Sequence, residues 1–364
     1  HRKKIRGTYT IGKETTALLR SGIIVTMKKG DTVEALLDAC RQFGSIVKRA
    51  LPTMHVIGNL VRRVLFIIRD EFLRSRNRYV LQQQAEKRES EKNKNLSSAA
   101  AAATQEKSKN SSSTASGLSN STSETSLVHQ LNLANLLETS GSEQVDYTLA
   151  VSTDFKAHVI EGVNELIREL DDLRTNIGEQ ATEHIHTNEV ILTIGHSHTV
   201  EDFLLDALKK KRNFEVIVTE HAPHYDGHEM VLRLKKEGIH CHLISDAAAY
   251  AVMPTVSKVL IGTHAVMANG GLIASTGTHL VALAAREKSV PVVVCSGLYK
   301  LTPLYPLDQD SFNDRLAPSD ILGYDGALMK SVHVYNPAYD YVPPELVAMF
   351  ITNNGTHNPT YIYR

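Results

Sequence analysis

The second half of the chain alternates short apolar runs, rich in β-branched residues, with stretches of helical periodicity. The apolar runs cover residues 190–194, 216–219, 242–244, 259–261 and 292–295, and the helical stretches lie near 199–210, 228–237, 247–253 and 278–286. This alternation is the signature of a parallel sheet covered by helices, because parallel strands need a crossover between them and are buried on both faces. It predicts an α/β fold with a doubly wound, Rossmann-like parallel-sheet domain over residues 187–364. A turn sequence at residues 269–271 also predicts a small hairpin within this domain.

The first half shows helical periodicity on both sides of a polar stretch. Apolar residues recur at intervals of three and four within residues 33–43, 57–72 and 155–173. From Ala85 to Ser126 the chain is instead rich in Glu, Lys, Asn, Ser and Thr, with a run of Ala. Such a composition buries too little apolar surface to offset the entropy of ordering. We therefore expect an N-terminal α-helical domain in two parts, residues 1–84 and 127–186, separated by a disordered low-complexity insert at 85–126.

The charge balance argues against two classes of partner. The chain has 40 Lys plus Arg and 40 Asp plus Glu, so no net field draws it to nucleic acid or to an anionic membrane. No run of the sequence approaches the ~18 to 20 consecutive apolar residues of a membrane span. The three cysteines, Cys40, Cys241 and Cys295, are odd in number and far apart, which favours reduced thiols over a disulfide framework. We expect a cytoplasmic protein that binds neither nucleic acid nor membrane directly.

The loops after the predicted strands are where a ligand would bind, because ligands of doubly wound sheets gather at the carboxyl ends of the strands. The first of these loops contains Gly195, His196 and Ser197 and leads into a helix whose start can hold an anion. Thr278 opens another helix, for which a plain N-cap and a phosphate site are equally good explanations. Neither loop has the glycine spacing of a dinucleotide fold or the Gly-Lys pair of a phosphate-binding loop, so we predict no nucleotide cofactor.

Histidines and acidic residues in the same loops have both a chemical and a structural explanation. Histidines spaced by two residues occur at 184 and 186, 196 and 198, and 240 and 242, and a further group lies at 221, 224 and 228. Such a pair could bind zinc, but no Cys or carboxylate accompanies these pairs at a known spacing, so we predict no metal site. Glu220 and Asp246 each follow a strand and could act as an acid and a base. For Asp246 we favour the alternative that it is the N-cap of the following helix.

Taken in order, these loops resemble a known family. The stretches that carry the resemblance are 191–198 (ILTIGHSH), 218–227 (VTEHAPHYDG), 246–248 (DAA), 261–270 (IGTHAVMANG) and 277–278. They resemble the isomerases acting on methylthioribose 1-phosphate and ribose 1,5-bisphosphate, and the alpha, beta and delta subunits of the guanine-nucleotide exchange factor for eukaryotic translation initiation factor 2. These proteins share one framework, and the resemblance covers roughly residues 152–364. Five further stretches resemble the beta-type members of the family in particular: residues 58–65, 227–230, 298–303, 339–346 and 361–364.

The resemblance also implies that the isomerase chemistry is missing. The isomerases have a Cys where this chain has Gly195, an Asp where it has His264 and an Arg where it has Ala222. Gly195 has no side chain that could move a proton, and Ala222 cannot anchor a phosphate. We therefore expect no catalytic residue. The expected vestigial pocket consists of Gly195, His196, Ser197, Glu220, Asp246, His264, Asn269, Gly277 and Thr278.

The resemblance implies a non-catalytic regulatory and scaffold subunit. Its partners would be the delta, alpha, gamma and epsilon subunits of a decameric exchange factor, together with initiation factor 2 and especially the phosphorylated form of that factor's alpha subunit. Arg62, Arg63 and Arg69 are candidates for reading the phosphate, with the alternative that they form the solvated side of an amphipathic helix. Two other functions remain open: a sugar-phosphate isomerase with His264 as an unusual base, and a metabolite-sensing module that uses the vestigial pocket.

Overall fold

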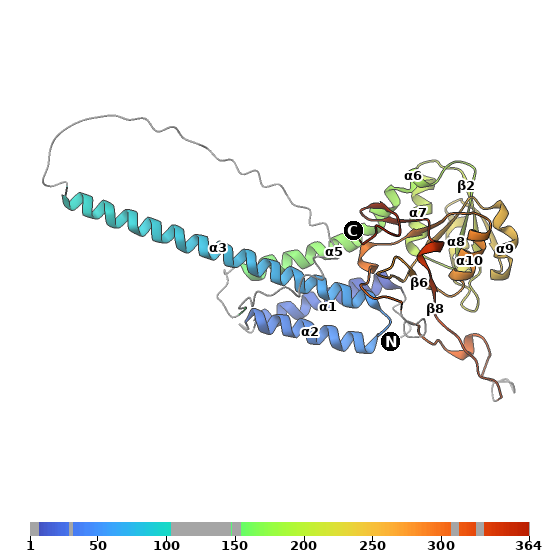
Figure 1. Ribbon diagram of the computed structural model, residues 1–364, viewed down its shortest axis with the longest axis horizontal. Helices are drawn as coiled ribbons and strands as arrows, with labels where there is room; N and C mark the ends of the chain where they lie inside the picture. Colours follow the sequence, from blue (N-terminus) through green and yellow to red (C-terminus); the bar gives the residue numbers. More distant parts are fainter. Residues whose placement is uncertain are drawn as a thin grey trace.

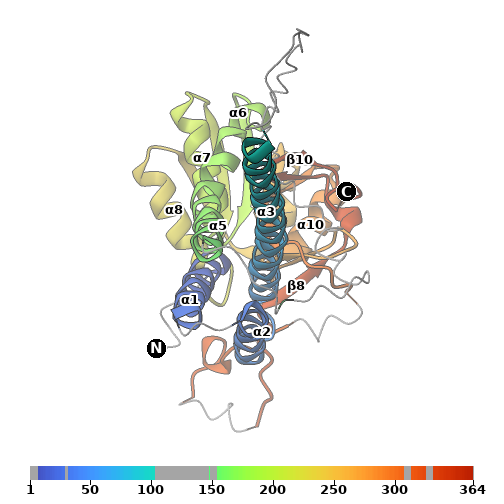
Figure 2. The same ribbon diagram turned by 90° about the vertical axis from the view of Figure 1, so that its left-hand side faces the viewer.

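The computed structural model describes residues 7–28, 32–102, 147, 154–306, 313–324 and 331–363, with the backbone alone at 28 and 80–102. These residues form a helical half and an α/β half (Figure 1). The helical half consists of α1 (Thr8–Lys28), α2 (Val33–Ala50), α3 (His55–Ala102) and α5 (Phe155–Glu179), followed by the short α6 (Ala181–His184). The view along α3 shows α1, α2, α3 and α5 as neighbouring helices (Figure 2).

Helix α3 continues into the segment that the sequence predicts to be disordered. Residues 85–102 are helical in backbone, whereas we expected the disordered insert to begin at Ala85. The sequence from Ala85 to Ala102 contains no Gly or Pro and is rich in Ala, Glu and Lys, which favour a helix without any apolar face. This part of α3 extends beyond its neighbouring helices (Figure 1). Among the described residues, no helix has an apolar stretch long enough to cross a membrane. Residues 103–126 lie outside the described residues, so the division of the chain into domains stays a prediction.

The α/β half is built on a seven-stranded sheet with the order β10-β9-β7-β4-β1-β2-β3. Its strands are β1 (Glu189–Ile194), β2 (Phe214–Thr219), β3 (His240–Ile244), β4 (Lys258–Gly262), β7 (Val292–Cys295), β9 (Met349–Thr352) and β10 (Gly355–His357). All neighbouring pairs are parallel except β9 with β10. The five apolar runs of the sequence are therefore confirmed as β1, β2, β3, β4 and β7, and their carboxyl ends meet at one edge of the sheet.

Helices cover both faces of this sheet, which confirms the doubly wound fold. Helices α7 (His198–Lys209) and α8 (Asp226–Lys236) lie on one face, and α10 (Thr278–Glu287) and α9 (Ala249–Val252) on the other. Two short 3₁₀ turns, η2 (Asp246–Ala248) and η3 (Met253–Thr255), flank α9. Ile191 packs into the core on the α7 side and its neighbour Leu192 into the core on the α10 side, because successive side chains of a strand point to opposite faces. The core on the α7 side also contains apolar residues of α1, α2, α3 and α5, so the two halves share one hydrophobic core.

A second, three-stranded antiparallel sheet lies beside the first and has the order β5-β6-β8. Strands β5 (Ala265–Val266) and β6 (Leu272–Ser275) form the hairpin that the turn sequence predicts. Strand β8 (Tyr339–Val342) pairs with β6, so that residues far along the chain return next to the start of α10. A 3₁₀ turn, η4 (Leu298–Lys300), follows β7. Helix α1 and strands β8, β9 and β10 were not among the elements predicted from the sequence.

Candidate functional site

The loop after β1 turns sharply at Gly195. Gly195 has a φ of +57°, in the left-handed region that favours glycine. A Cβ atom at this position would lie 3.1 to 3.2 Å from atoms of the His221 side chain. Ser197 follows as the N-cap residue of α7 and makes no side-chain capping hydrogen bond. Gly195, the first predicted site residue, therefore forms a backbone turn beside His221, and a larger residue at this position would require the His221 side chain to shift.

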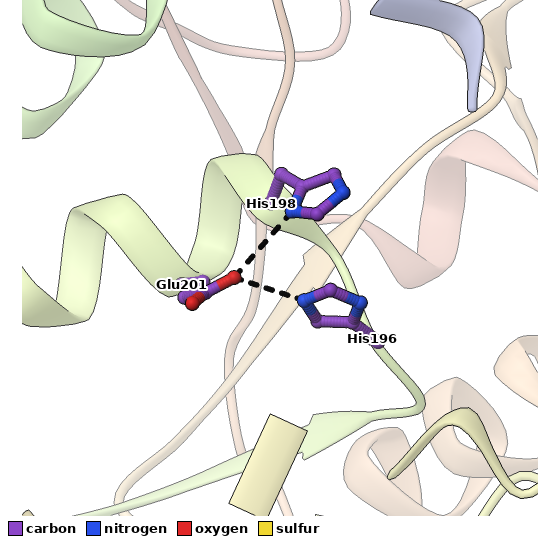
Figure 3. A group of neighbouring side chains, drawn as sticks. All are labelled: His196, His198 and Glu201. Carbon is purple, nitrogen blue, oxygen red and sulfur yellow. Dashed lines mark hydrogen bonds and ion pairs between the residues drawn. The ribbon is translucent and has the colours of Figure 1, made fainter. Parts of the chain in front are cut away.

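His196 of this loop and His198, the first residue of α7, converge on one buried carboxylate (Figure 3). His196 Nε2 lies 2.9 Å and His198 Nδ1 lies 3.5 Å from the same oxygen, Oε2 of Glu201, in the first turn of α7. Arg233 of α8 lies 3.6 Å from the other oxygen, Oε1. Burial alone would raise the pKa of the Glu201 carboxyl, but the hydrogen bonds from the two histidines and the charge of Arg233 outweigh burial and hold that pKa well below its ordinary value. The expectation that no carboxylate accompanies the histidine pairs is wrong for His196 and His198.

The loop after β2 is held by the carboxylate of Asp246. His221 has a φ of +62°, and the peptide bond between Ala222 and Pro223 is cis. Oδ1 of Asp246 accepts a 2.9 Å hydrogen bond from the His221 amide, and Oδ2 accepts a 2.7 Å bond from the Ala222 amide. Asp246 is the first residue of η2. The N-cap of η2 is the preceding residue, Ser245, whose side chain makes no capping hydrogen bond. The N-cap role that we favoured for Asp246 is wrong, because its carboxylate is committed to a neighbouring loop.

The start of α10 is occupied by a carboxylate from β8. Gly277 has a φ of +94°, and its amide donates a 2.6 Å hydrogen bond to Oδ2 of Asp340. The amide of His279 donates to the same oxygen at 3.2 Å. Thr278 is buried, and its hydroxyl bonds back to the Ser275 carbonyl at 2.6 Å. The helix start that we considered as a phosphate site therefore already carries an anion supplied by the chain itself.

His264 faces the helical half of the molecule. Its Nε2 lies 3.2 Å from the carbonyl oxygen of Thr53, and its ring stacks on Tyr339 with ring centres 4.3 Å apart. Burial lowers the pKa of His264 to about 4, an effect that the hydrogen bond to Thr53 partly opposes and that the nearby Lys300 reinforces. His264 is neutral at pH 7 and tethers the α/β half to the segment between α2 and α3.

Two other predicted site residues, Asn269 and Glu220, have unrelated surroundings. Asn269 is exposed at the β5–β6 turn, where its Nδ2 donates to Tyr341 and its Oδ1 accepts from the Gly271 amide. These bonds fix the hairpin. Glu220 is half-buried at the end of β2, and its carboxylate makes no hydrogen bond or ion pair with any residue that the structure describes.

The three arginines of α3 have different environments. Arg62 is exposed, and its Nη1 donates to Asn59 within the same helix at 3.3 Å. Arg63 is largely buried and pairs with Glu169 of α5. The Nε of Arg69 is buried and has no hydrogen-bond partner among the described residues. The idea that all three form one solvated face is therefore wrong, since Arg62 alone of the three is exposed.

Comparison with known proteins decides the family. The model of the initiation factor 2 subunit family matches residues 4–359. The chain belongs to the initiation factor 2 subunit family. It is 46% identical to the translation initiation factor eIF2B subunit beta of Dictyostelium discoideum over 369 residues, covering 100% of this chain and 91% of the relative. It is 37% identical to the subunit of the same name from Schizosaccharomyces pombe over 372 residues, with the same coverage.

Solved structures show the same fold. The crystal structure of eIF2B beta from Chaetomium thermophilum is similar with a TM-score of 0.62 at 23% identity, covering 99% of this chain and 84% of that chain. A chain of the tetrameric eIF2B-beta2-delta2 complex from C. thermophilum is similar with a TM-score of 0.64 at 23% identity, covering 100% of this chain and 88% of that chain. The fold of this initiation factor 2 subunit family member is thus that of solved members.

Within this family member, the predicted site residues gather only in part. Gly195 lies beside His221, since a Cβ added to the glycine would meet that side chain, and the His221 amide bonds to Asp246, so these three residues lie together. His196 turns instead toward Glu201, and His264 toward Thr53. The residues that we expected in one vestigial pocket therefore make several separate contacts along the sheet edge.

Three polar residues of this edge were not predicted from the sequence: Glu201, Asp340 and Lys300. Glu201 follows His198 by three residues on a helix, a spacing that places both on one face. Lys300 is buried after β7, and its Nζ donates to the Thr263 carbonyl at 2.7 Å. Burial lowers the pKa of Lys300 to about 8. Lys300 follows a predicted strand by a few residues, which was a usable signal, whereas nothing local in the sequence connects Asp340 with α10.

Proposed function

We propose that the chain is a non-catalytic, beta-type regulatory subunit of the guanine-nucleotide exchange factor for initiation factor 2, and that it acts in the cytoplasm. In this proposal it assembles with delta, alpha, gamma and epsilon subunits and helps to sense phosphorylation of the alpha subunit of initiation factor 2. The observation that carries the proposal is the 46% identity to an eIF2B subunit beta across the whole chain.

The geometry of the sheet edge supports a non-catalytic role. An isomerase needs a group that moves a proton and an open place for a phosphate. Gly195 offers no side chain, and His264 is turned toward Thr53 with a pKa of about 4. The amides that could bind a phosphate at the start of α10 already bind Asp340. Contacts within the chain thus stabilise this edge of the sheet without any bound substrate.

An exposed apolar face supports a role as a subunit. An open groove between η2, α9 and α10 is lined by Ala247, Tyr250, His279, Leu280, Leu283, Ala284 and Asp340. Tyr250 and Leu280 are 50% and 52% exposed there. Contiguous exposed apolar side chains mark protein contacts more often than free surface. We propose that a delta-type chain covers this groove, since a related solved structure is a complex of beta with delta subunits.

The test is purification of the tagged chain from native extract, followed by mass spectrometry of the proteins that co-elute. We expect delta, alpha, gamma and epsilon subunits in stable ratio. Leu280→Asp is expected to reduce recovery of delta, whereas Leu243→Asp is the matched control, because Leu243 is 44% exposed but lies away from the groove on β3.

Two results would contradict the proposal. The first is a homogeneous homodimer without the other subunits. The second is turnover of methylthioribose 1-phosphate or ribose 1,5-bisphosphate that is abolished by His264→Ala. Equal loss of delta with Leu280→Asp and Leu243→Asp would contradict the assignment of the groove alone.

A further inference from the structure

Three side chains that metal ions accept as ligands meet at the end of β1. Nε2 of His196 and Nδ1 of His198 both face Oε2 of Glu201, at 2.9 and 3.5 Å (Figure 3). All three candidate ligand atoms lie within 4.8 Å of one another. Ligand atoms around tetrahedral zinc lie about 2.0–2.1 Å from the metal and therefore about 3.3 Å from each other. Small rotations of the two imidazoles would bring the three atoms to that spacing.

The local backbone preorganises this group. His196 lies in the loop that Gly195 turns, and His198 and Glu201 lie in the first turn of α7, three residues apart on one helix face. The two rings pack edge to face with centres 4.5 Å apart. The ligand atoms thus come from a tight turn and a helix start, whose positions are fixed by the sheet beneath them.

The burial pattern suits a cation that reaches the group from solvent. The side chains of Glu201 and His196 are only 9% and 10% exposed, whereas His198 is 49% exposed. A buried carboxylate is costly unless a positive charge or strong donors compensate it. In the described residues the compensation comes from the two imidazoles and from Arg233, which lies 3.6 Å from Oε1 and leaves Oε2 to the histidines. The exposed edge of His198 provides an entry path.

We propose that His196, His198 and Glu201 form a binding site for a divalent transition-metal ion of the zinc class, with its remaining position open to water. Two imidazoles and one carboxylate match Zn²⁺ and related ions, whereas Ca²⁺ and Mg²⁺ prefer sites made of oxygen atoms. The bound ion joins the loop after β1 to the first turn of α7. Arg233 also forms an ion pair with Glu229 at 2.7 Å. The arginine therefore remains paired when the metal ion compensates the charge of Glu201. This site replaces the expectation, drawn from sequence spacing, of no metal.

The test uses the full chain, expressed without a histidine tag and stripped with a chelator. Zn²⁺ binding is measured by titration calorimetry, and Co²⁺ by its visible absorption. We expect one saturable site per chain, and at least about tenfold weaker binding in His198→Ala. His198 is the most exposed ligand, so this variant keeps its fold, which circular dichroism checks. His196→Ala is the second variant.

The matched control is the double variant His240→Ala/His242→Ala. His240 and His242 have the same spacing as His196 and His198 and are exposed, and His242 lies 3.7 Å from the carboxylate of Glu215. This variant is expected to bind Zn²⁺ as the unmodified chain does. Absence of saturable binding by the unmodified chain would overturn the proposal. Equal affinity in the unmodified chain, His196→Ala and His198→Ala would also overturn it.

Discussion

Oδ2 of Asp340 accepts a 2.6 Å hydrogen bond from the backbone amide of Gly277, where α10 begins. The amide of His279 points at the same oxygen, so the carboxylate lies on the positive end of the helix. Asp246 holds the amides of His221 and Ala222 in a similar way. At both places a side chain of the protein fills an amide site that could otherwise hold an anion.

Asp340→Ala is expected to lower the free energy of unfolding by about 1–2 kcal/mol, because two helix-start amides lose their acceptor. Asp340→Asn keeps an acceptor oxygen and should lose less. Urea denaturation measures both. The control is Asp172→Ala, which removes an exposed carboxylate from the middle of α5. Equal losses in Asp340→Ala and Asp172→Ala would show that the cap at α10 contributes nothing.

Asp246→Ala is expected to destabilise the chain by about 1–3 kcal/mol, because it leaves the amides of His221 and Ala222 without their carboxylate. Glu220→Ala is the matched control at the neighbouring strand end and should change stability little, since no described residue bonds to its carboxylate. Denaturant midpoints of the two variants check this difference. If the Glu220 variant loses as much as the Asp246 variant, the role given to Asp246 is wrong.

Gly195→Ala should destabilise the chain for two reasons, a left-handed φ and contacts of 3.1 to 3.2 Å between the new Cβ and His221. Gly238→Ala tests a positive φ without such contacts, because Gly238 has a φ of +94° and a Cβ added there would meet no atom within 4 Å. The left-handed region costs an L-residue roughly 1–2 kcal/mol. The Gly195 variant is expected to lose more than the Gly238 variant in thermal or urea unfolding. A loss at Gly195 no larger than the roughly 1–2 kcal/mol of the left-handed region would mean that His221 moves aside freely.

The sequence predicts the fold well where a pattern is local. Runs such as 190–194 and 292–295 are apolar and β-branched, and each became a buried parallel strand. Strands β8 and β9 have only four residues each, and they join their sheets by pairing with β6 and β7, which lie more than 50 residues earlier in the chain. Their place depends on tertiary contacts that no local periodicity records.

The site was predicted less well for a similar reason. The loops do follow the ends of the predicted strands, but most partners of the loop residues come from elsewhere in the chain. Asp340 reaches Gly277 from a strand that follows it by some sixty positions, and Thr53 reaches His264 across more than two hundred. Glu201 differs from these partners, because it follows His198 by only three residues on α7. That helical spacing was visible in the sequence, although Glu201 was not predicted from it.

Stability should fall on acidification because of His264. The unfolded chain protonates His264 near its ordinary pKa of 6.5, whereas the folded chain does so only near 4. Between these values the unfolded state binds more protons, so the free energy of unfolding decreases as the pH falls from about 6.5 to 4, by up to about 3 kcal/mol from this residue. Burial lowers the pKa of His184 and His221 in the same direction. Urea denaturation at several pH values should therefore give a shallower acid slope in His264→Gln than in the unmodified chain, and identical slopes would contradict the assignment.

The final prediction separates two neighbouring arginines of α3 and rests on the proposed regulatory function. A phosphoserine adds close to two negative charges, which arginines read by paired hydrogen bonds. Arg62 is exposed and available for such a contact. Arg63 is held against Glu169 of α5, so Arg63→Glu would place two carboxylates together and loosen the helices. Only the Arg62 variant can report on recognition without disturbing the fold.

Arg62→Glu is expected to weaken binding of the phosphorylated alpha subunit of initiation factor 2 while leaving assembly with delta intact. Arg76→Glu makes the same charge change at an exposed position about 21 Å further along α3 and should have little effect. Binding of both phospho-forms is measured at fixed ionic strength, because a general charge effect would weaken both forms and follow the salt concentration. A loss confined to the phosphorylated form and to the Arg62 variant is the result that phosphate reading requires. Unchanged affinities for both forms, with the fold preserved, would remove this face of α3 from the sensing surface.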